Sequence, residues 1–349
     1  MFWSKFHIIS ALLIGLMALC LACSCEMVPK NVRNGRKTVC ASFYLLADFA
    51  QKIVGDEMDV VCVMPPGADV HSWEPTPKKV LEMTRADAFL MNGAELEEWT
   101  EKIQPMLKKR KIPVFVAANS VELGGTHECS CGHHHDADDD HDAHDHHDHH
   151  DHDAHDHHDH DHDHHDHDAH DHHDHDHGAD PHIWLSARNM KKILTDLTDF
   201  FSELDPKNAE KYRANAAKYE AECDALDAEF QAVTKDLKNR KLVVAHSAFW
   251  YLCRDYGLEQ VALEGYSAYS DPSPAQMVKI IAFIKENQIP VIYAVSSESS
   301  KGAETISRET GVKVGVLSSL ETLTQAQLDA GADYFSVMRE NIAQLKLNE

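Results

Sequence analysis

Residues 205–239 read DPKNAEKYRANAAKYEAECDALDAEFQAVTKDLKN, and they carry the most regular pattern in the chain. Apolar residues recur at alternating intervals of three and four positions, at Ala209, Tyr212, Ala216, Tyr219, Cys223, Leu226, Phe230, Val233 and Leu237. This spacing places one apolar stripe on a single α-helix, which at 1.5 Å per residue would be roughly 50 Å long. A coiled coil is one use for such a stripe. Because a second α/β pattern begins where the stripe ends, we predict instead a rigid helix that joins two lobes.

Strands and helices alternate on both sides of this helix. Before it, residues 38–126 and 179–204 contain four short apolar runs that we interpret as strands, at residues 39–43, 60–64, 88–91 and 113–117. After it, residues 240–349 contain four more, at residues 242–245, 260–263, 291–294 and 314–317. Alternation with short connections favours parallel sheets that helices cover on both faces. The predicted fold class is α/β, with two doubly wound parallel-sheet lobes joined by one long helix.

The first lobe is interrupted by residues 127–178, which we call the His/Asp tract. It holds 24 of the 28 histidines of the chain. With 18 Asp, one Glu and no Lys or Arg, it carries −19 of the formal net charge of −25, which leaves −6 for the rest. Acidic surfaces repel nucleic-acid phosphates and attract cations. Nucleic-acid binding is therefore excluded, and a cation is the expected ligand.

The composition of the His/Asp tract indicates how it would act. Imidazole is the commonest protein ligand for divalent transition metals, and carboxylate adds charge attraction. Almost nothing apolar is present to offset the entropy of ordering the backbone, so we expect disorder. A flexible polar spacer is the alternative interpretation. We predict a metal-collecting loop, whose first clustered histidines are His133, His134, His135, His141, His144, His146, His147, His149 and His150.

The first 24 residues have the features of an export signal. Lys5 precedes an apolar run, Phe6–Leu21, which is shorter than the roughly 20 residues that span a bilayer. Small residues before Cys23 resemble a bacterial lipoprotein signal, with Cys23 as the acylated residue, although ordinary cleavage near Ser24 stays open. We expect an exported protein in the periplasm or at the outer face of the cell membrane, at most lipid-anchored.

Two cysteines fall in neighbouring predicted strands of the first lobe. Cys40 lies in the first strand and Cys62 in the second. An oxidising compartment would allow them to pair as a disulfide, whereas free cysteines are also among the most buried residues of proteins. Both alternatives are compatible with the sequence.

Four histidines lie outside the His/Asp tract, and three of them follow predicted strands. His7 belongs to the export signal, whereas His71, His182 and His246 follow the second and fourth strands of the first lobe and the first strand of the second lobe. Ligands of open parallel sheets bind at the carboxyl ends of the strands. A single histidine is usually structural, but three at the same edge predict a shared metal site between the lobes.

Several motifs resemble those of the zinc/manganese solute-binding proteins of ABC transporters. PPGADVHSWEPTP at residues 65–77, DPHIWLS at 180–186 and VVAHSAFWY at 243–251 are similar to the three histidine-ligand motifs of that family. Residues 205–219 resemble its linking helix, and DPSP at 271–274 resembles a further family segment. The resemblance extends from about residue 38 to the C-terminus, and a histidine-rich loop before the second ligand is typical of the zinc-importing members.

The resemblance implies a binding protein rather than an enzyme. It implies that His71, His182 and His246 bind a divalent metal ion between the lobes, and that a monomer delivers the ion to an ABC permease in the inner membrane. Many relatives have an aspartate ligand where this chain has Ser318. The fourth ligand is therefore left open between water, Glu74 and the Ser318 hydroxyl.

The ligand types favour Zn²⁺ over Mn²⁺. Three neutral imidazoles with an open tetrahedral position suit zinc, whereas manganese prefers more oxygen ligands. The same arrangement occurs in catalytic zinc sites, so one alternative is a secreted zinc hydrolase with Glu74 as base. A surface metal-storage protein or adhesin is another. The paired lobes, and the lack of a metalloprotease motif in the sequence, favour capture and release.

Overall fold

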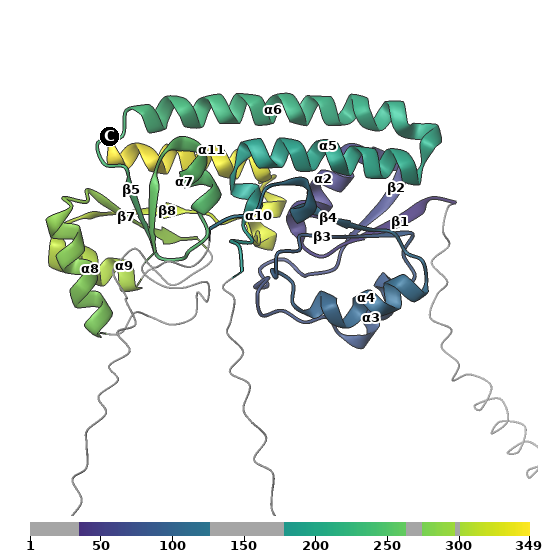
Figure 1. Ribbon diagram of the computed structural model, residues 1–349, viewed down its shortest axis with the longest axis horizontal. Coiled ribbons are helices and arrows are strands. Elements are labelled where there is room, and N and C mark those ends of the chain that lie inside the picture. The colour runs from purple at the N-terminus through teal and green to yellow at the C-terminus, as the bar shows by residue number, and fades with distance from the viewer. Residues whose placement is uncertain (1–34, 126–177, 263–273, 297–300) are drawn as a thin grey trace, which may run out of the picture.

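The computed structural model describes residues 35–125, 178–262, 274–296 and 301–349 (Figure 1). The export signal with Cys23, nearly all of the His/Asp tract with its clustered histidines, and residues 271–273 lie outside the described residues, so the predictions for them stay predictions. Among the described helices, none combines the length and the apolar character needed to cross a membrane.

Two four-stranded parallel sheets form the centres of two lobes that lie side by side (Figure 1). The first sheet contains β1 (Lys37–Ala41), β2 (Met58–Cys62), β3 (Ala88–Met91) and β4 (Val114–Val116) in the order β2-β1-β3-β4. The second contains β5 (Lys241–Val244), β6 (Glu259–Ala262), β7 (Val291–Val295) and β8 (Lys313–Leu317) in the order β6-β5-β7-β8. The predicted fold class of two parallel-sheet lobes is confirmed.

Helices cover both faces of the sheets. The helices of the first lobe are α2 (Tyr44–Val54), α3 (Pro77–Met83), α4 (Trp99–Lys109) and α5 (Ala187–Leu204). Those of the second lobe are α7 (Trp250–Tyr256), α8 (Pro274–Glu286), α9 (Lys301–Thr310), α10 (Gln325–Asp329) and α11 (Tyr334–Leu345). The Thr76 and Ser186 side chains accept backbone N–H bonds at the starts of α3 and α5, as N-cap residues do. These caps fix where the two helices begin.

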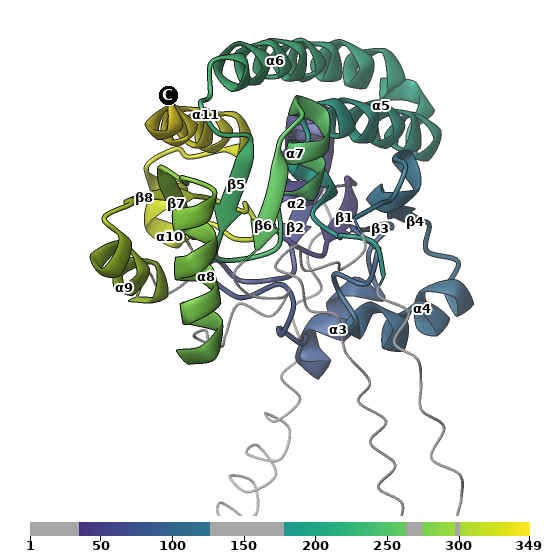
Figure 2. The ribbon, with the colours of Figure 1, turned by 60° about the vertical axis from the view of Figure 1, so that its left-hand side comes forward.

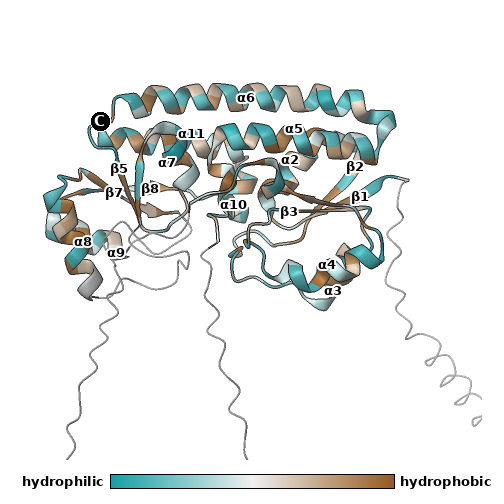
Figure 3. Cartoon of the chain, in the orientation of Figure 1, coloured by the Kyte–Doolittle hydropathy of each residue, from teal (hydrophilic) through white to brown (hydrophobic). Residues whose placement is uncertain are grey.

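The long helix is α6 (Ala209–Lys235), which follows a 3-10 turn at Pro206–Asn208. Its 27 residues correspond to about 40 Å, less than predicted, because the α-helix begins only at Ala209 and ends at Lys235. The apolar stripe packs against α5, α2 and α11, so α6 lies along both lobes (Figures 1 and 2). Teal residues alternate with brown ones along α6, whereas β3 is brown throughout (Figure 3). Helix α6 is thus amphipathic, and its apolar face packs into the hydrophobic core.

One hydrophobic cluster continues through both lobes. It contains Phe43 and Phe49 of the first lobe, Phe230 of α6, and Tyr293 and Tyr334 of the second lobe, all of which are buried. Separating the lobes would expose this apolar surface, at a cost of about 25 cal/mol per Å². The lobes are therefore packed together by their cores as well as joined by the chain.

The two cysteines of the first sheet are free thiols. Cys40 pairs in register with Val61, and Cys62 pairs with Ala41, so the two side chains leave opposite faces of the sheet. Burial raises the pKa of both thiols to about 11. Of the two alternatives that the sequence allows, the structure contains free thiols, with Cys40 buried and Cys62 partly buried.

Candidate metal centre

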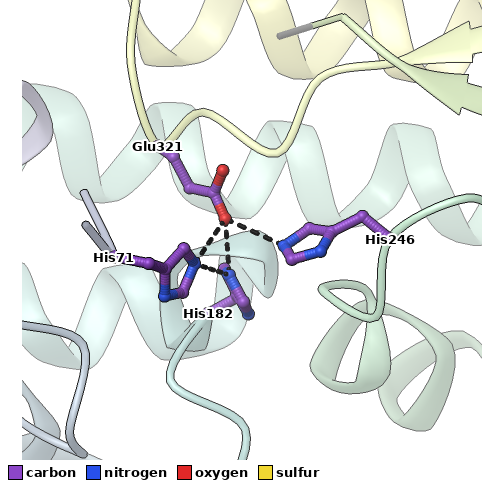
Figure 4. A group of neighbouring side chains, drawn as sticks. All are labelled: His71, His182, His246 and Glu321. Carbon is purple, nitrogen blue, oxygen red and sulfur yellow. Dashed lines mark hydrogen bonds and ion pairs between the residues drawn. The ribbon is translucent and has the colours of Figure 1, made fainter. Parts of the chain in front are cut away.

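Four side chains from four loops meet between the lobes (Figure 4). His71 follows β2, His182 precedes α5, His246 follows β5, and Glu321 follows β8. One ligand atom of each residue lies within 4.8 Å of the others. The structure therefore brings together the three histidines that the sequence predicts and adds a carboxylate.

One oxygen of Glu321 lies at the centre of the group. Its Oε1 atom is 3.1 Å from His71 Nε2, 2.6 Å from His182 Nε2 and 3.1 Å from His246 Nε2 (Figure 4). His182 and His246 are fully buried, whereas the His71 side chain keeps 23% of its surface exposed. Solvent therefore reaches the group from the His71 side.

The structure places Glu321, and not Glu74, with the three histidines, while the fourth ligand itself stays a prediction. Glu74 points away from the group, since its carboxylate pairs with Lys102 at 2.6 Å and its side chain is 65% exposed. The Ser318 hydroxyl accepts a hydrogen bond from the Leu320 N–H at 3.2 Å. Glu321, three residues after Ser318, places a carboxylate oxygen among the three histidines.

Local backbone geometry explains how Glu321 reaches the group. Leu320 is buried and has a φ of +58°, which is unusual for a residue with a side chain. This left-handed residue reverses the chain between β8 and Glu321. The sequence feature that could have indicated Glu321 is its position close to the end of the last predicted strand, at the edge of the sheet where ligands are expected. A leucine gives no indication of a left-handed turn, so the sequence did not reveal which residue faces the site.

Asp180 orients His182. Its Oδ1 atom accepts the backbone N–H of His182 at 2.9 Å and lies 2.7 Å from His182 Nδ1. Because a carboxylate only accepts, Nδ1 carries a proton and Nε2 faces the centre. Burial alone lowers the pKa of His182, but the Asp180 and Glu321 carboxylates outweigh it and raise this pKa to about 9. The ring is therefore held in one orientation and protonated at neutral pH.

The pKa of Glu321 moves in the opposite direction. Burial by itself would raise this pKa, but hydrogen bonds from His182, His246 and His71 hold it well below its ordinary value. The Glu321 carboxylate is therefore ionised, and the three imidazole rings surround it with hydrogen-bond donors. A divalent cation bound among the three rings would replace the proton on His182 Nε2 with a larger positive charge at the same place.

Two residues of the first lobe support the peptide before His182. The Asn92 side-chain amide donates to the Pro181 carbonyl at 2.9 Å. The buried Glu97 carboxylate accepts the backbone N–H groups of Asn92 and Gly93, at 2.9 and 3.1 Å. Burial raises the pKa of Glu97. This network fixes the turn after β3 and, through it, the position of His182.

The residues on either side of the His/Asp tract are hydrogen-bonded to each other, beside helix α7 of the second lobe. The Asp180 N–H donates to the Gly124 carbonyl at 3.0 Å. The Tyr251 hydroxyl, on α7, donates to the Asp180 carbonyl at 2.8 Å and accepts the Gly124 N–H at 3.3 Å. A Cβ atom at Gly125 would lie 2.7 Å from Trp250 Cγ, so glycine is needed there. The described residues on either side of the tract therefore meet beside Asp180, two residues from His182.

The family model for the zinc-uptake complex component A, periplasmic, matches residues 39–347. The chain belongs to that family. Within the zinc-uptake component A family, it is 32% identical over 341 residues to the zinc-binding lipoprotein AdcA of Streptococcus pneumoniae serotype 4, covering 97% of this chain and 60% of AdcA. It is 29% identical over 345 residues to the high-affinity zinc uptake system protein ZnuA of Bacillus subtilis, covering 99% and 97%.

A solved structure has a similar fold and a related sequence. The crystal structure of Zn(II)-bound AdcA from Streptococcus pneumoniae matches with a TM-score of 0.70 and 29% sequence identity, over 90% of this chain and 58% of AdcA. The chain thus spans about 60% of the length of the AdcA proteins that it matches.

Proposed function

We propose that this chain captures Zn²⁺ with His71, His182, His246 and Glu321 and delivers it to an ABC permease. The observation that carries the proposal is the convergence of four donor atoms from both lobes within 4.8 Å. Because two donors come from each lobe, movement of one lobe relative to the other would remove half of the ligands. Such a site suits capture followed by release. The zinc-uptake names of the family and of the ZnuA relative support it.

The donor types favour zinc. Three imidazole nitrogens and one carboxylate oxygen complete a tetrahedron, the geometry that zinc adopts in closed sites. Manganese prefers more oxygen donors. The Glu321 and Asp180 carboxyl groups, both buried, would balance the two positive charges of the ion. The ion would therefore enter a site that is already electrostatically matched to it.

The donor set argues against the hydrolase alternative. Catalytic zinc keeps one position open for water, whereas Glu321 stands in the fourth position here. Glu74, the proposed base, is on the surface and pairs with Lys102. A reacting water would therefore lack both a place on the metal and a base.

The His/Asp tract and the export signal extend the proposal. The tract would hold several ions weakly beside the tight site, since its flanks meet next to Asp180. The export signal would place the protein outside the cytoplasm, anchored through Cys23. A relative named as a lipoprotein supports this anchoring.

Deletion of residues 127–177 is expected to leave one tight zinc ion per chain. Gly124 and Asp180 are already hydrogen-bonded to each other, so the shortened connection should close without disturbing the lobes. Calorimetric titration of both proteins provides the measurement. The additional ions of the full-length chain should disappear below about pH 6, since imidazoles with pKa near 6.5 protonate. A deleted protein without tight zinc binding would refute the proposed site.

Zinc binding at pH 7 is expected to release about one proton from the tight site. The pKa of His182 is about 9 in the metal-free protein, so its Nε2 atom is protonated at pH 7 and must lose that proton to bind zinc. Zinc affinity should accordingly increase with pH and level off above about 9. Calorimetry of the tract-deleted protein in buffers of different ionisation enthalpy counts the protons. Equal heats in all buffers would contradict the expectation.

A further inference from the structure

The two oxygens of Glu321 have different partners. Oε1 contacts the three histidine rings, whereas Oε2 accepts a hydrogen bond from the Ser319 hydroxyl at 3.0 Å. Figure 4 shows the first oxygen directed at the rings and the second directed away from them. Both residues are buried, so water does not compete freely for Oε2. Ser319 therefore determines which oxygen is offered to the centre.

Ser319 is held in place by the first lobe. Its carbonyl accepts the Trp184 indole N–H at 2.7 Å, and the Trp184 carbonyl in turn accepts the Tyr334 hydroxyl at 2.9 Å. Trp184 is 1% exposed and follows His182 by two residues. The position of the serine is thus tied to the same segment that supplies His182.

The neighbouring residue makes the turn rigid. The Ser318 N–H donates to Asn341 Oδ1 at 2.8 Å, and the Asn341 amide donates to the Ser318 carbonyl at 2.9 Å. The Ser318 hydroxyl also accepts the N–H of Leu320, the left-handed residue. With the backbone fixed on both sides, the Ser319 hydroxyl has little freedom to leave Oε2. A side chain held in this way keeps its hydrogen bond when the carboxylate is bound on its other oxygen.

We propose that Ser319 is a specificity-determining residue, which restricts Glu321 to one metal-binding oxygen. The inference rests on the proposed function and deepens it. A carboxylate can bind a metal through one or both oxygens, and the hydrogen bond at Oε2 opposes the second mode. The site then offers three nitrogens and one oxygen, the number that zinc accepts. Manganese, which favours more oxygen donors, is disfavoured by the same hydrogen bond.

Ser319→Ala in the full-length protein tests the proposal. Zinc and manganese are titrated in competition, with a chelator buffering free metal so that only the tight site fills. We expect the preference for zinc over manganese to fall about tenfold, the size typical of changes around metal ligands. Visible absorption of the protein loaded with one equivalent of Co²⁺ should weaken, because five-coordinate cobalt absorbs less than four-coordinate cobalt.

Three further variants complete the experiment. Ser319→Thr keeps the hydroxyl and should retain the wild-type preference and spectrum. Ser319→Cys, a weak donor of similar size, should shift both in the direction of alanine and replaces it if alanine does not fold. Ser202→Ala is the matched control, because that buried hydroxyl donates to the Thr198 carbonyl within α5 and touches none of the four donors. It should change neither readout.

The outcomes separate the inference from the proposed function. Equal losses of zinc and manganese affinity with an unchanged cobalt spectrum would mean that Ser319 is only structural, and the inference would be overturned. An unchanged preference in Ser319→Ala and Ser319→Cys would overturn it too, while tight zinc binding would leave the proposed function intact. Absence of tight zinc binding in the wild-type protein would refute the proposed function itself.

Discussion

Replacing His182 with alanine is expected to weaken tight zinc binding by more than about 100-fold. Changes in residues that merely support a ligand commonly cost 10- to 100-fold, and His182 is itself one of the four proposed donors. Its ring is fixed by Asp180 and contacts Glu321 at 2.6 Å, so no neighbouring side chain can take its place. Competition against a chelator of known zinc affinity measures the loss.

His150→Ala is the matched control for this substitution. It removes one imidazole from the His/Asp tract, where 23 other histidines remain. We expect no measurable change in the tight site and a minor change in the weaker ones. If His182→Ala and His150→Ala had equal effects in the full-length protein, the distinction between tight site and tract would fail.

His182→Ala should also destabilise the metal-free protein. Removing the His182 ring leaves the buried Asp180 and Glu321 carboxylates without their common partner. Breaking a buried ion pair on one side costs about 3–5 kcal/mol. Thermal unfolding without metal therefore has to accompany the binding measurement, so that lost affinity is not confused with lost structure.

The three histidines of the group could be predicted from the sequence because of a topological rule. Each of them follows a run of apolar residues, and the carboxyl ends of parallel strands meet at one edge. Glu321 was missed because its approach depends on Leu320, whose left-handed backbone has no sequence signal. Glu74 was preferred because it is near His71 in sequence, yet its carboxylate pairs with Lys102 on the surface. Sequence proximity did not predict direction.

Element boundaries were less predictable than the elements themselves. The first strand, predicted at residues 39–43, spans Lys37–Ala41 instead, since Lys37 and Thr38 pair with the start of β2. Strand β2 begins at Met58 because Met58 and Asp59 pair with β1, although Asp59 is polar. In both places backbone pairing overrides residue preference.

The hydrophobic core that the two lobes share could not be predicted from the sequence either. Periodicity shows that one face of α6 is apolar, but it does not show what covers that face. The structure covers it with α5 and α2 on one side and α11 on the other. The prediction of a rigid connecting helix therefore described its apolar pattern, whereas its packing partners come from segments far apart in the chain.

Replacing Trp184 with alanine is expected to cost about 3–5 kcal/mol of unfolding free energy, the range for large buried aromatic side chains. The indole is 1% exposed and packs on Phe43, with ring centroids 5.2 Å apart. It also joins the lobes through its hydrogen bond to the Ser319 carbonyl. Urea unfolding of the metal-free protein measures the loss. Zinc affinity should fall as well, because the loop that carries Glu321 loses its contact with the His182 segment.

Trp184→Phe separates the hydrogen bond from the packing. Phenylalanine fills most of the space but has no N–H, so the buried Ser319 carbonyl loses a partner and we expect a cost of about 1–3 kcal/mol. Trp73→Ala is the comparison for alanine, because Trp73 is only half-buried against Trp99 and should cost less than Trp184→Ala. Equal losses for Trp73→Ala and Trp184→Ala would show that Trp184 does not hold the lobes together. In Trp184→Phe, an unchanged zinc affinity would show that the hydrogen bond to Ser319 is not needed to position Glu321.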